Sequence, residues 1–227
     1  MATTEVKKLW AIMVLVLLAI IALLIVAVTA GNRRAPSALE PLTLSQPVTL
    51  GEWTAGLASS SVAVVEYSDF QCPACATYAP VVKQLIADYG DRISVTYRHF
   101  PLGIHPNAPA AAAASEAAGL QGKFWEMSDV LFERQADWSA TRAPEELFLS
   151  YARTLGLNVE RFTADLNSAA VKRAVADDLA SANATGLSHT PTFFINGQEI
   201  DNPNSYDEFS ALVEVALSST SATTTAR

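Results

Sequence analysis

The sequence has few cysteines and a shortage of basic residues. Only two Cys occur among 227 residues, too few for the disulfide-stapled scaffold of a small secreted domain. Residues 1–34 hold four basic and one acidic side chain, so the remainder carries 11 basic and 22 acidic ones. Nucleic-acid binding depends on basic side chains that displace counterions. We therefore expect no nucleic-acid partner for this acidic body.

The chain also lacks internal repeats and the biased composition of fibrous or disordered proteins. With 10 Gly, 11 Pro and half of its residues apolar, it fits neither the collagen-like, the coiled-coil nor the wholly disordered class. Its length suggests one or two domains. A folded body with a substantial core is the expectation.

A long hydrophobic run lies near the N-terminus. Residues 9–30 read LWAIMVLVLLAIIALLIVAVTA, without a charged side chain. A helix of that length crosses a hydrocarbon core of roughly 30 Å, whereas the apolar part of a cleavable signal has roughly 7–15 residues. We expect a single transmembrane anchor over 9–30. The alternatives are a cleaved signal, for which Val28-Thr29-Ala30 offers small residues, and a buried core helix.

The rest of the chain divides by composition into three parts. Residues 31–57 are rich in Pro, Ser, Thr and Gly and predict a linker, whose end around Trp53 could pack as an edge strand. Residues 58–217 hold the periodic apolar pattern of a folded domain. Residues 218–227 read SSTSATTTAR, are polar without periodicity, and predict a disordered tail.

Within the folded part, strand patterns flank a long helical stretch. A β-branched run, a helix ending at Gly90 and a second β-branched run predict a right-handed βαβ unit. Asn196-Gly197 between two short apolar runs predicts a hairpin. The order of these strands and helices along the chain predicts an α/β fold. It consists of a small mixed sheet whose two halves are separated in the sequence by a helical insertion over about 106–186. The expected strands are 62–67, 93–97, 192–195 and 198–200, and the expected helices are 72–87, 108–121, 124–135, 144–155, 159–166, 171–184 and 205–217.

The two cysteines stand three positions apart in Cys72-Pro73-Ala74-Cys75, directly after a predicted strand and at the start of a predicted helix. Free N–H groups and the helix dipole favour a negative charge there, so the Cys72 thiol should ionise more readily than a free thiol. A thiolate is the attacking and leaving group in disulfide exchange. Cys75, one turn later, lies deeper and could resolve a mixed disulfide.

Two other interpretations of the cysteine pair stay open. The thiols could be buried and inert, although a strand-to-helix turn faces solvent. They could belong to a zinc site, but structural zinc needs four ligands, and the three histidines, His99, His105 and His189, are isolated from one another. We expect neither a metal nor a cofactor, and a structural role for His99 and His105.

Glu66 and the Thr190-Pro191 pair are further candidates for the site. Glu66 precedes Cys72 by six positions among apolar neighbours. Buried below the pair, it could take the proton of Cys75; the alternative is an outward-facing strand residue. Pro191 lacks an N–H and would leave a free edge to receive an extended peptide. The Thr190-Pro191 bond could be cis or an ordinary trans bond at a strand start.

Four stretches of this sequence together resemble the DsbA-like thiol:disulfide oxidoreductases, in their membrane-anchored or exported bacterial branch. The similarity covers about 61–217. The matching stretches are VVEYSDFQCPAC at 64–75, YRHFPL with HPNA at 97–108, GKFW at 122–125 and TPTFFING at 190–197.

The resemblance implies a thioredoxin fold with an inserted helical domain. It implies that Cys72 is the nucleophile, Cys75 the resolving cysteine, Pro191 a cis proline and Glu66 the buried acid. The expected substrates are exported proteins with thiols or disulfides. Strongly oxidising members carry His at the position of Ala74, so a cation beside the thiolate is missing here.

Three functions follow as hypotheses. The first is an oxidase that introduces disulfides into exported proteins and is recycled by a membrane redox partner, with residues 1–8 in the cytoplasm and the domain outside. The second is a reductase or isomerase in the same compartment, against which the lack of a dimerisation domain argues mildly. The third is a tethered binding protein or chaperone without thiol chemistry. We expect a monomer.

Overall fold

The computed structural model describes residues 10, 13, 15–23 and 41–225. It divides into Met1–Glu40 and Pro41–Arg227. In the first unit the described residues are helical, with exposed apolar side chains such as Trp10 and Leu23. Among all described residues, none of the helices is long and apolar enough to cross a membrane. The expected cytoplasmic segment 1–8 lies outside the described residues and so does much of the expected anchor 9–30, so both stay predictions.

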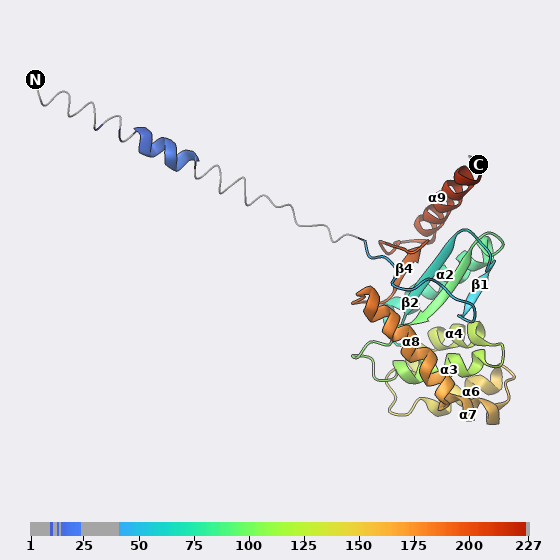
Figure 1. Cartoon of the computed structure of the whole chain (residues 1–227). Coiled ribbons are helices and arrows are strands. Elements are labelled where there is room, and N and C mark those ends of the chain that lie inside the picture. Colours follow the sequence, from blue (N-terminus) through green and yellow to red (C-terminus); the bar gives the residue numbers. More distant parts are fainter. Residues whose placement is uncertain (1–9, 11–12, 14, 24–40, 226–227) are drawn as a thin grey trace, which may run out of the picture. The chain divides into compact units, whose positions relative to one another are not determined.

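The second unit is built on a five-stranded mixed sheet of order β1-β3-β2-β4-β5 (Figure 1). Strands β2 and β3 run parallel, and the other neighbouring pairs are antiparallel. The crossover between β2 and β3 is helix α2, Pro73–Tyr89, which ends before Gly90 as predicted. The strands are Thr54–Gly56 (β1), Ala63–Ser68 (β2), Ser94–His99 (β3), Thr192–Ile195 (β4) and Gln198–Ile200 (β5).

Helices cover both faces of the sheet because its central strands are apolar on both sides. Val64 packs with residues of α2 and of α9, Tyr206–Thr225, whereas the next residue, Val65, packs on the opposite face near α8, Ala169–Thr185. This alternation is the period of two expected of a strand. It places even-numbered β2 residues, including Glu66 and Ser68, on the α2 face.

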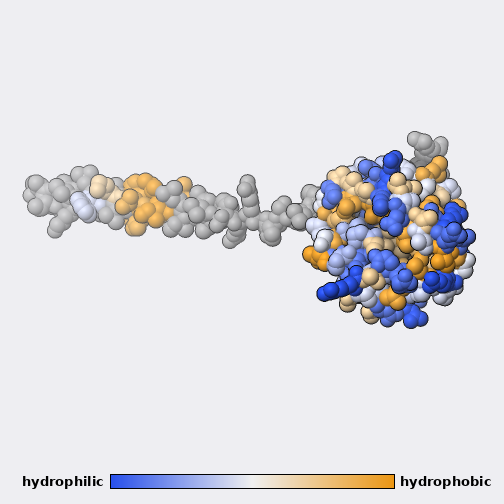
Figure 2. Space-filling model, turned by 90° about the horizontal axis from the view of Figure 1, so that it is seen from below, coloured by the Kyte–Doolittle hydropathy of each residue, from blue (hydrophilic) through white to orange (hydrophobic). Residues whose placement is uncertain are grey.

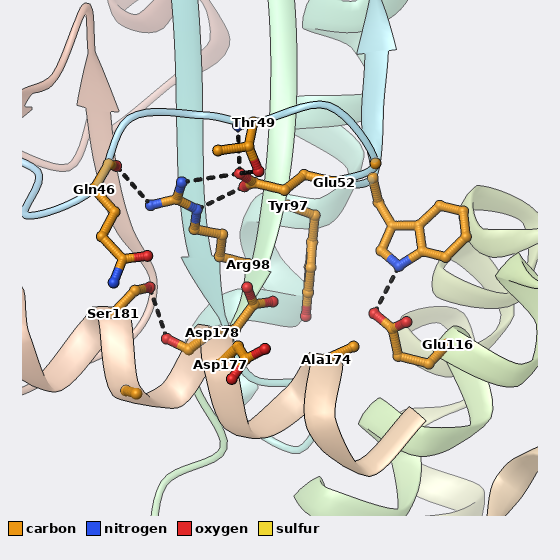
Figure 3. Close-up of a pocket in the computed structure, with 13 residues that line it drawn as sticks. Gln46, Thr49, Glu52, Tyr97, Arg98, Glu116, Ala174, Asp177, Asp178 and Ser181 are labelled. Atoms are coloured by element: carbon orange, nitrogen blue, oxygen red, sulfur yellow. Dashed lines mark hydrogen bonds and ion pairs between the residues drawn. The ribbon is translucent and has the colours of Figure 1, made fainter. Parts of the chain in front are cut away.

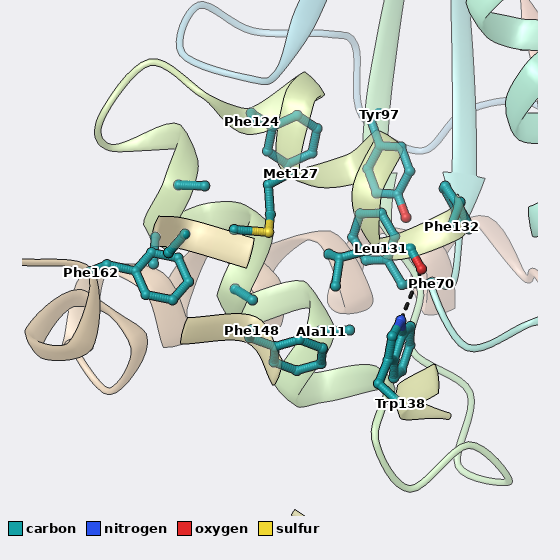
Figure 4. Packing of buried hydrophobic residues seen from close by; sticks show 14 of the residues in the cluster. Phe70, Tyr97, Ala111, Phe124, Met127, Leu131, Phe132, Trp138, Phe148 and Phe162 are labelled. Carbon is teal, nitrogen blue, oxygen red and sulfur yellow. Dashed lines mark hydrogen bonds between the residues drawn. The ribbon is translucent and has the colours of Figure 1, made fainter. Parts of the chain in front are cut away.

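The insertion between β3 and β4 forms a helical subdomain with its own aromatic core (Figure 4). Trp138, Phe148 and Phe162 are buried there. Small alanines on α3, Ala108–Gly119, let the neighbouring helices approach closely, and Gly119 lies directly under the Trp53 ring. The predicted thioredoxin fold with an inserted helical domain is confirmed. Its helices are Ala108–Gly119 (α3), Phe124–Glu133 (α4), Gln135–Trp138 (α5), Glu145–Thr154 (α6), Val159–Leu166 (α7) and α8.

The described part of the predicted linker, residues 41–57, is bound to the domain. Arg98 is buried and donates to the Glu52 carboxylate and the Gln46 carbonyl (Figure 3). It also donates to the Pro47 carbonyl and the Tyr67 hydroxyl. A buried guanidinium requires such partners, and this segment supplies most of them. Composition alone predicted a linker here, and that expectation was wrong for residues 41–53, which are bound to the domain. Strand β1 forms the expected edge strand.

The expected disordered tail was also wrong over most of its length. Helix α9 continues to Thr225 instead of ending at Leu217. The hydroxyls of Ser218, Ser219 and Thr220 donate to carbonyls one turn earlier. Such bonds satisfy the hydroxyl within the helix, so a Ser- and Thr-rich sequence need not end it.

Candidate redox site

The turn between β2 and α2 presents the two cysteines at the start of the helix. Cys72 is the N-cap residue, in extended conformation, and Pro73 occupies the first helical turn, where its missing N–H is not needed. Both cysteines are free thiols. Cys72 retains 7% of its surface exposed, whereas Cys75 is fully buried one turn later. Cys75 thus lies deeper than Cys72, as predicted, but the expectation that the turn leaves Cys72 open to solvent was wrong, because both cysteines are buried.

The surroundings of Cys72 stabilise its thiolate. Hydrogen bonding from the Cys75 thiol lowers the pKa of Cys72 to about 5, supported by the Thr190 side chain and by the backbone N–H groups of Ala74 and Cys75, and opposed by burial. These N–H groups are the free donors of the first helical turn. The thiolate therefore forms well below neutral pH without a cation at the position of Ala74.

Cys75 has the opposite electrostatic environment. Burial is the main cause that raises the pKa of its thiol far above the usual range, and hydrogen bonding to Cys72 and the nearby Glu66 charge raise it further. Ionisation is thus concentrated on the outer sulfur. A proton that leaves or reaches the inner sulfur needs an acceptor or donor close by.

Glu66 lies on β2 beneath the cysteine pair, on the α2 face of the sheet. Its side chain is 4% exposed, which answers the open question of its orientation: it points inward. Desolvation by burial raises the pKa of the carboxyl to about 7, and the nearby Ser68 hydroxyl partly offsets this. A carboxyl with a pKa near neutrality can both accept and give a proton at physiological pH.

The segment before β4 lies against the outer sulfur. The Cys72 thiol donates to the Thr190 carbonyl oxygen at 3.5 Å, and the Thr190-Pro191 peptide bond is cis. The Pro191 carbonyl accepts from the Asn202 side chain at 2.8 Å. The structure thus brings residues 118 positions apart, Cys72 and Thr190, into one site.

The helical insertion fixes the turn that carries Cys72, through residues that the sequence did not single out. The Gln135 side chain donates to the carbonyls of Phe70 and Cys72, at 2.7 and 3.0 Å. Asp69 accepts from the backbone N–H of Gln71 at 2.7 Å and of Leu102 at 2.9 Å. No spacing rule connects Gln135 with a turn over sixty residues earlier, so only the tertiary structure reveals it.

Two of the three histidines, His99 and His105, bind carboxylates. His105 Nδ1 lies 2.7 Å from Asp69 Oδ2, and His99 Nε2 lies 3.0 Å from Glu116 Oε1. Glu116 also accepts from the Trp53 indole N–H (Figure 3). His105 thereby supports Asp69 in the redox turn, whereas His99 joins the insertion to the sheet.

This arrangement provides each part that thiol–disulfide exchange requires. It has a stabilised outer thiolate, a buried second thiol in hydrogen-bonding contact with it, and an acid of near-neutral pKa beneath them. The fold and the site define the class of thiol–disulfide oxidoreductases built on the thioredoxin fold.

Comparison with known proteins identifies the family. A profile of the family described as Thioredoxin matches residues 49–215, and the chain belongs to this family. Its structural neighbours, described next, include DsbA proteins of the same fold.

Solved structures share the whole architecture, including the insertion. BdbD of Bacillus subtilis in its oxidised form is 25% identical, with a TM-score of 0.67 over 78% of this chain and 98% of that one. A thioredoxin-like oxidoreductase of Silicibacter pomeroyi is also 25% identical, with a TM-score of 0.64 over 74% and 93%. The α-DsbA1 protein of Wolbachia pipientis, at 20% identity and a TM-score of 0.67 over 78% and 95%, shares the fold.

Curated relatives of higher identity are much longer proteins. Na(+)/H(+) antiporter NhaA of Herminiimonas arsenicoxydans is 42% identical over 74% of this chain and 26% of its own length. Na(+)/H(+) antiporter NhaA 3 of Salinispora tropica is 39% identical over 72% and 24%. The chain spans about a quarter of the length of these relatives, and the transport activity in their names belongs to the longer proteins.

Proposed function

We propose that this oxidoreductase acts on exported proteins and donates its Cys72–Cys75 disulfide to them. The observation that carries the proposal is the stabilised Cys72 thiolate, whose pKa is lowered to about 5. A thiolate stabilised in the reduced protein makes the oxidised protein a stronger oxidant, as in the most oxidising members of the fold. The Cys75 thiol and the backbone N–H groups of the first helical turn supply this stabilisation although Ala74 carries no charge.

In the proposed exchange, Cys72 is the residue that substrates attack. A substrate thiolate bonds to Cys72 Sγ and breaks the Cys72–Cys75 bond, and Cys75 departs as a thiolate that takes a proton from Glu66. A second substrate thiolate then attacks the substrate sulfur of the mixed disulfide and displaces the Cys72 thiolate. The substrate gains one disulfide and the protein is left with a dithiol, so electrons balance.

Thr190 and Pro191 are proposed to hold the substrate. Their segment lies against Cys72, and Pro191 carries no N–H that would pair with a neighbouring strand. An extended substrate segment could align there with its sulfur facing Cys72. Peptide recognition through backbone groups would allow many different exported proteins to bind.

The proposed location is the outer side of a membrane, with residues 9–30 as anchor and residues 1–8 in the cytoplasm. The charge-free run of 9–30 supports an anchor, and an oxidising compartment suits disulfide donation. A membrane redox partner would reoxidise the pair. On the face seen in Figure 2, hydrophilic and hydrophobic residues are interspersed over the described part of the folded unit. The proposed state of the protein is a monomer.

The reduction potential and the resting redox state test the direction of exchange. We expect the potential of the full chain, equilibrated with glutathione, to lie nearer roughly −120 mV than roughly −270 mV. Trapping of free thiols in native membranes should show the pair mostly oxidised. A low potential with a reduced resting pair would instead establish the reductase or isomerase. A Cys72→Ser variant that retained all activity would indicate a binding protein or chaperone.

A further inference from the structure

The order of the strands places two segments beside the turn that carries Cys72. Strand β2 ends at Ser68, and its parallel neighbour β3 ends in register with it, at His99. On the other side, β4 begins at Thr192 and runs antiparallel to the end of β2. The turn after β2 therefore leaves the sheet between the segment before β4 and the loop after β3, residues 100–107. This loop is called the β3–α3 loop below.

A buried carboxylate joins the β3–α3 loop to the redox turn. Asp69 Oδ1 accepts from the N–H of Gln71 at 2.7 Å, within the turn. Asp69 Oδ2 accepts from the N–H of Leu102 at 2.9 Å and lies 2.7 Å from His105 Nδ1, both in the loop. The Cys72 N–H donates to the Asp69 carbonyl at 3.0 Å. One residue thus fixes the position of the loop relative to Cys72.

The middle of the β3–α3 loop presents an apolar side chain to solvent. Ile104 is 79% exposed, and it lies between the two loop residues that bind the Asp69 carboxylate. The end of the loop is also held, because the Asn107 N–H donates to the Gln71 side chain at 2.7 Å. A side chain on a fixed loop binds a partner with less loss of conformational entropy than one on a mobile loop. Ile104 is therefore preorganised for contact beside the redox turn.

The exposed side chains around Cys72 include no carboxylate. Outside residues 1–34 the protein has 22 acidic and 11 basic side chains, so a surface without acids differs from the average of the chain. An apolar surface favours a polypeptide segment with an apolar residue beside its cysteine, because contact removes apolar area from water on both partners. The exposed side chains of 72–75, 100–107 and 188–191 are Pro73, Ala74, Ile104, Pro106, Ser188 and His189.

We propose that Ile104 is a specificity-determining residue that contacts an apolar side chain beside the substrate's reacting cysteine, and that Asp69 is the positioning residue that holds it there. The inference rests on the proposed exchange between Cys72 and an extended substrate segment. With one part of that segment against Thr190 and Pro191, the part beyond the reacting sulfur reaches the β3–α3 loop. This contact exists before any sulfur reacts, so it lowers KM and leaves kcat nearly unchanged.

Kinetics with two peptides test the contact in the full chain. Both peptides carry two cysteines, and the first is flanked by leucine in one peptide and by serine in the other. The wild type should have a KM about tenfold lower for the leucine peptide, the effect of a modest apolar contact. Ile104→Ser should remove this preference, and Ile104→Leu should keep it. Because Ile104 is exposed, these changes leave the core intact.

Val215→Ser is the matched control. Val215 is also an exposed β-branched residue, 65% accessible, and it lies on α9, which extends from the end of the sheet away from the helical insertion (Figure 1). This variant should keep the full preference for the leucine peptide. A preference lost equally in Val215→Ser and Ile104→Ser would contradict the assignment of the contact to Ile104.

Asp69→Asn tests the positioning role. The amide oxygen can still accept from the Gln71 N–H, but the amide nitrogen replaces the oxygen that accepts from the Leu102 N–H. The loop should then lose its fixed position, and KM for the leucine peptide should rise by a larger factor than the rate with glutathione falls. Equal factors would show that Asp69 acts on Cys72 itself, and would overturn its role in placing the loop.

The outcomes separate this inference from the proposed function. Equal KM values for the two peptides in the wild type, or an undiminished preference in Ile104→Ser, would overturn the inference alone, since exchange itself would still be seen. A wild type that exchanges with neither the peptides nor glutathione would overturn the proposed function and the inference together. Should the protein prove to be a reductase, the same peptides in their disulfide form should show the same preference, and its absence would again overturn the inference.

Discussion

At the scale of single residues, the thiol pKa values of the two cysteines differ because the two sulfurs have different surroundings at the helix start. Cys72 receives the free N–H groups of the first turn and the Cys75 thiol proton, whereas Cys75 is desolvated with Glu66 nearby. The first effect favours a thiolate and the second opposes one. The same four-residue motif therefore yields one ionised and one protonated sulfur at neutral pH.

Direct titration of the reduced protein checks whether one sulfur ionises at low pH while the other stays protonated. The ultraviolet absorbance of the thiolate should rise with a midpoint at pH about 5, and a Cys72→Ser variant should lose that transition. Cys75→Ala removes the hydrogen bond that contributes most to the shift, so its transition should move to higher pH. A midpoint in the range of an ordinary thiol for the wild type would contradict the site's electrostatics.

The buried Glu66 carboxyl should make the free energy of unfolding depend on pH. This dependence can be measured in a Cys72→Ser background. Its pKa is raised from 4.5 to about 7 in the folded protein, so the unfolded chain releases the proton first as the pH rises. The contribution is fully present below pH 4.5 and is lost as the pH rises through about 7, by on the order of 3 kcal/mol. Urea unfolding at several pH values measures it.

Glu66→Gln in the same background should remove the part of this loss that falls between about pH 6 and pH 7. A loss of comparable size and the same sign should persist at lower pH, because burial also raises the pKa of Asp178, from 3.8 to about 6. Equal pH profiles with Glu66 and with Gln at this position would mean that the carboxyl is solvated in solution.

At the scale of elements, the short helix α5 holds the redox turn although it has only four residues. Its first residue, Gln135, donates to two carbonyls of the turn. Gln135→Ala leaves both carbonyls short of a donor, and we expect a loss of about 1–3 kcal/mol in unfolding free energy together with a shifted Cys72 titration. Gln84→Ala, at an exposed position of α2, is the control and should stay within about 0.5 kcal/mol of the wild type. Similar losses in both variants would refute the role of α5.

The contact between α3 and the segment 41–57 also depends on single residues, Gly119 and Trp53. A Cβ at Gly119 would lie 2.3 Å from the Trp53 ring, which stacks on Phe124 with centroids 4.8 Å apart. Gly119→Ala should therefore displace the indole, with a loss of about 1–3 kcal/mol and altered tryptophan fluorescence. Gly103→Ala, where a Cβ meets nothing within 4 Å, is the matched control. A wild-type melting temperature for Gly119→Ala would contradict this packing.

Periodicity predicted most elements, and it was wrong where tertiary contacts decide the structure. The hairpin around Asn196-Gly197 and its two strands were confirmed at the expected residues. Helix α5 was missed because the sequence pattern merges it with α4. The bound segment 41–57 was missed because a buried Arg98 on another strand holds it, which composition does not reveal.

At the scale of the whole molecule, the sheet positions the site and the insertion stabilises it. The sequence predicted both cysteines, the acid and the proline, because each belongs to a motif or lies at a defined distance from one. It did not predict Ser68, Asp69 or Gln135, whose roles depend on which side chains the fold brings together. A helix of the insertion supplies the side-chain donor that holds the carbonyls of the redox turn.

Capture of substrates on Cys72 tests the central claim most directly. A Cys75→Ala variant of the full chain, expressed in its native host, lacks the thiol that resolves mixed disulfides. It should accumulate reductant-sensitive adducts with exported proteins, attached through Cys72. The double variant Cys72→Ala/Cys75→Ala should form none. An absence of adducts in Cys75→Ala, or equal adducts in Cys72→Ala, would contradict the account.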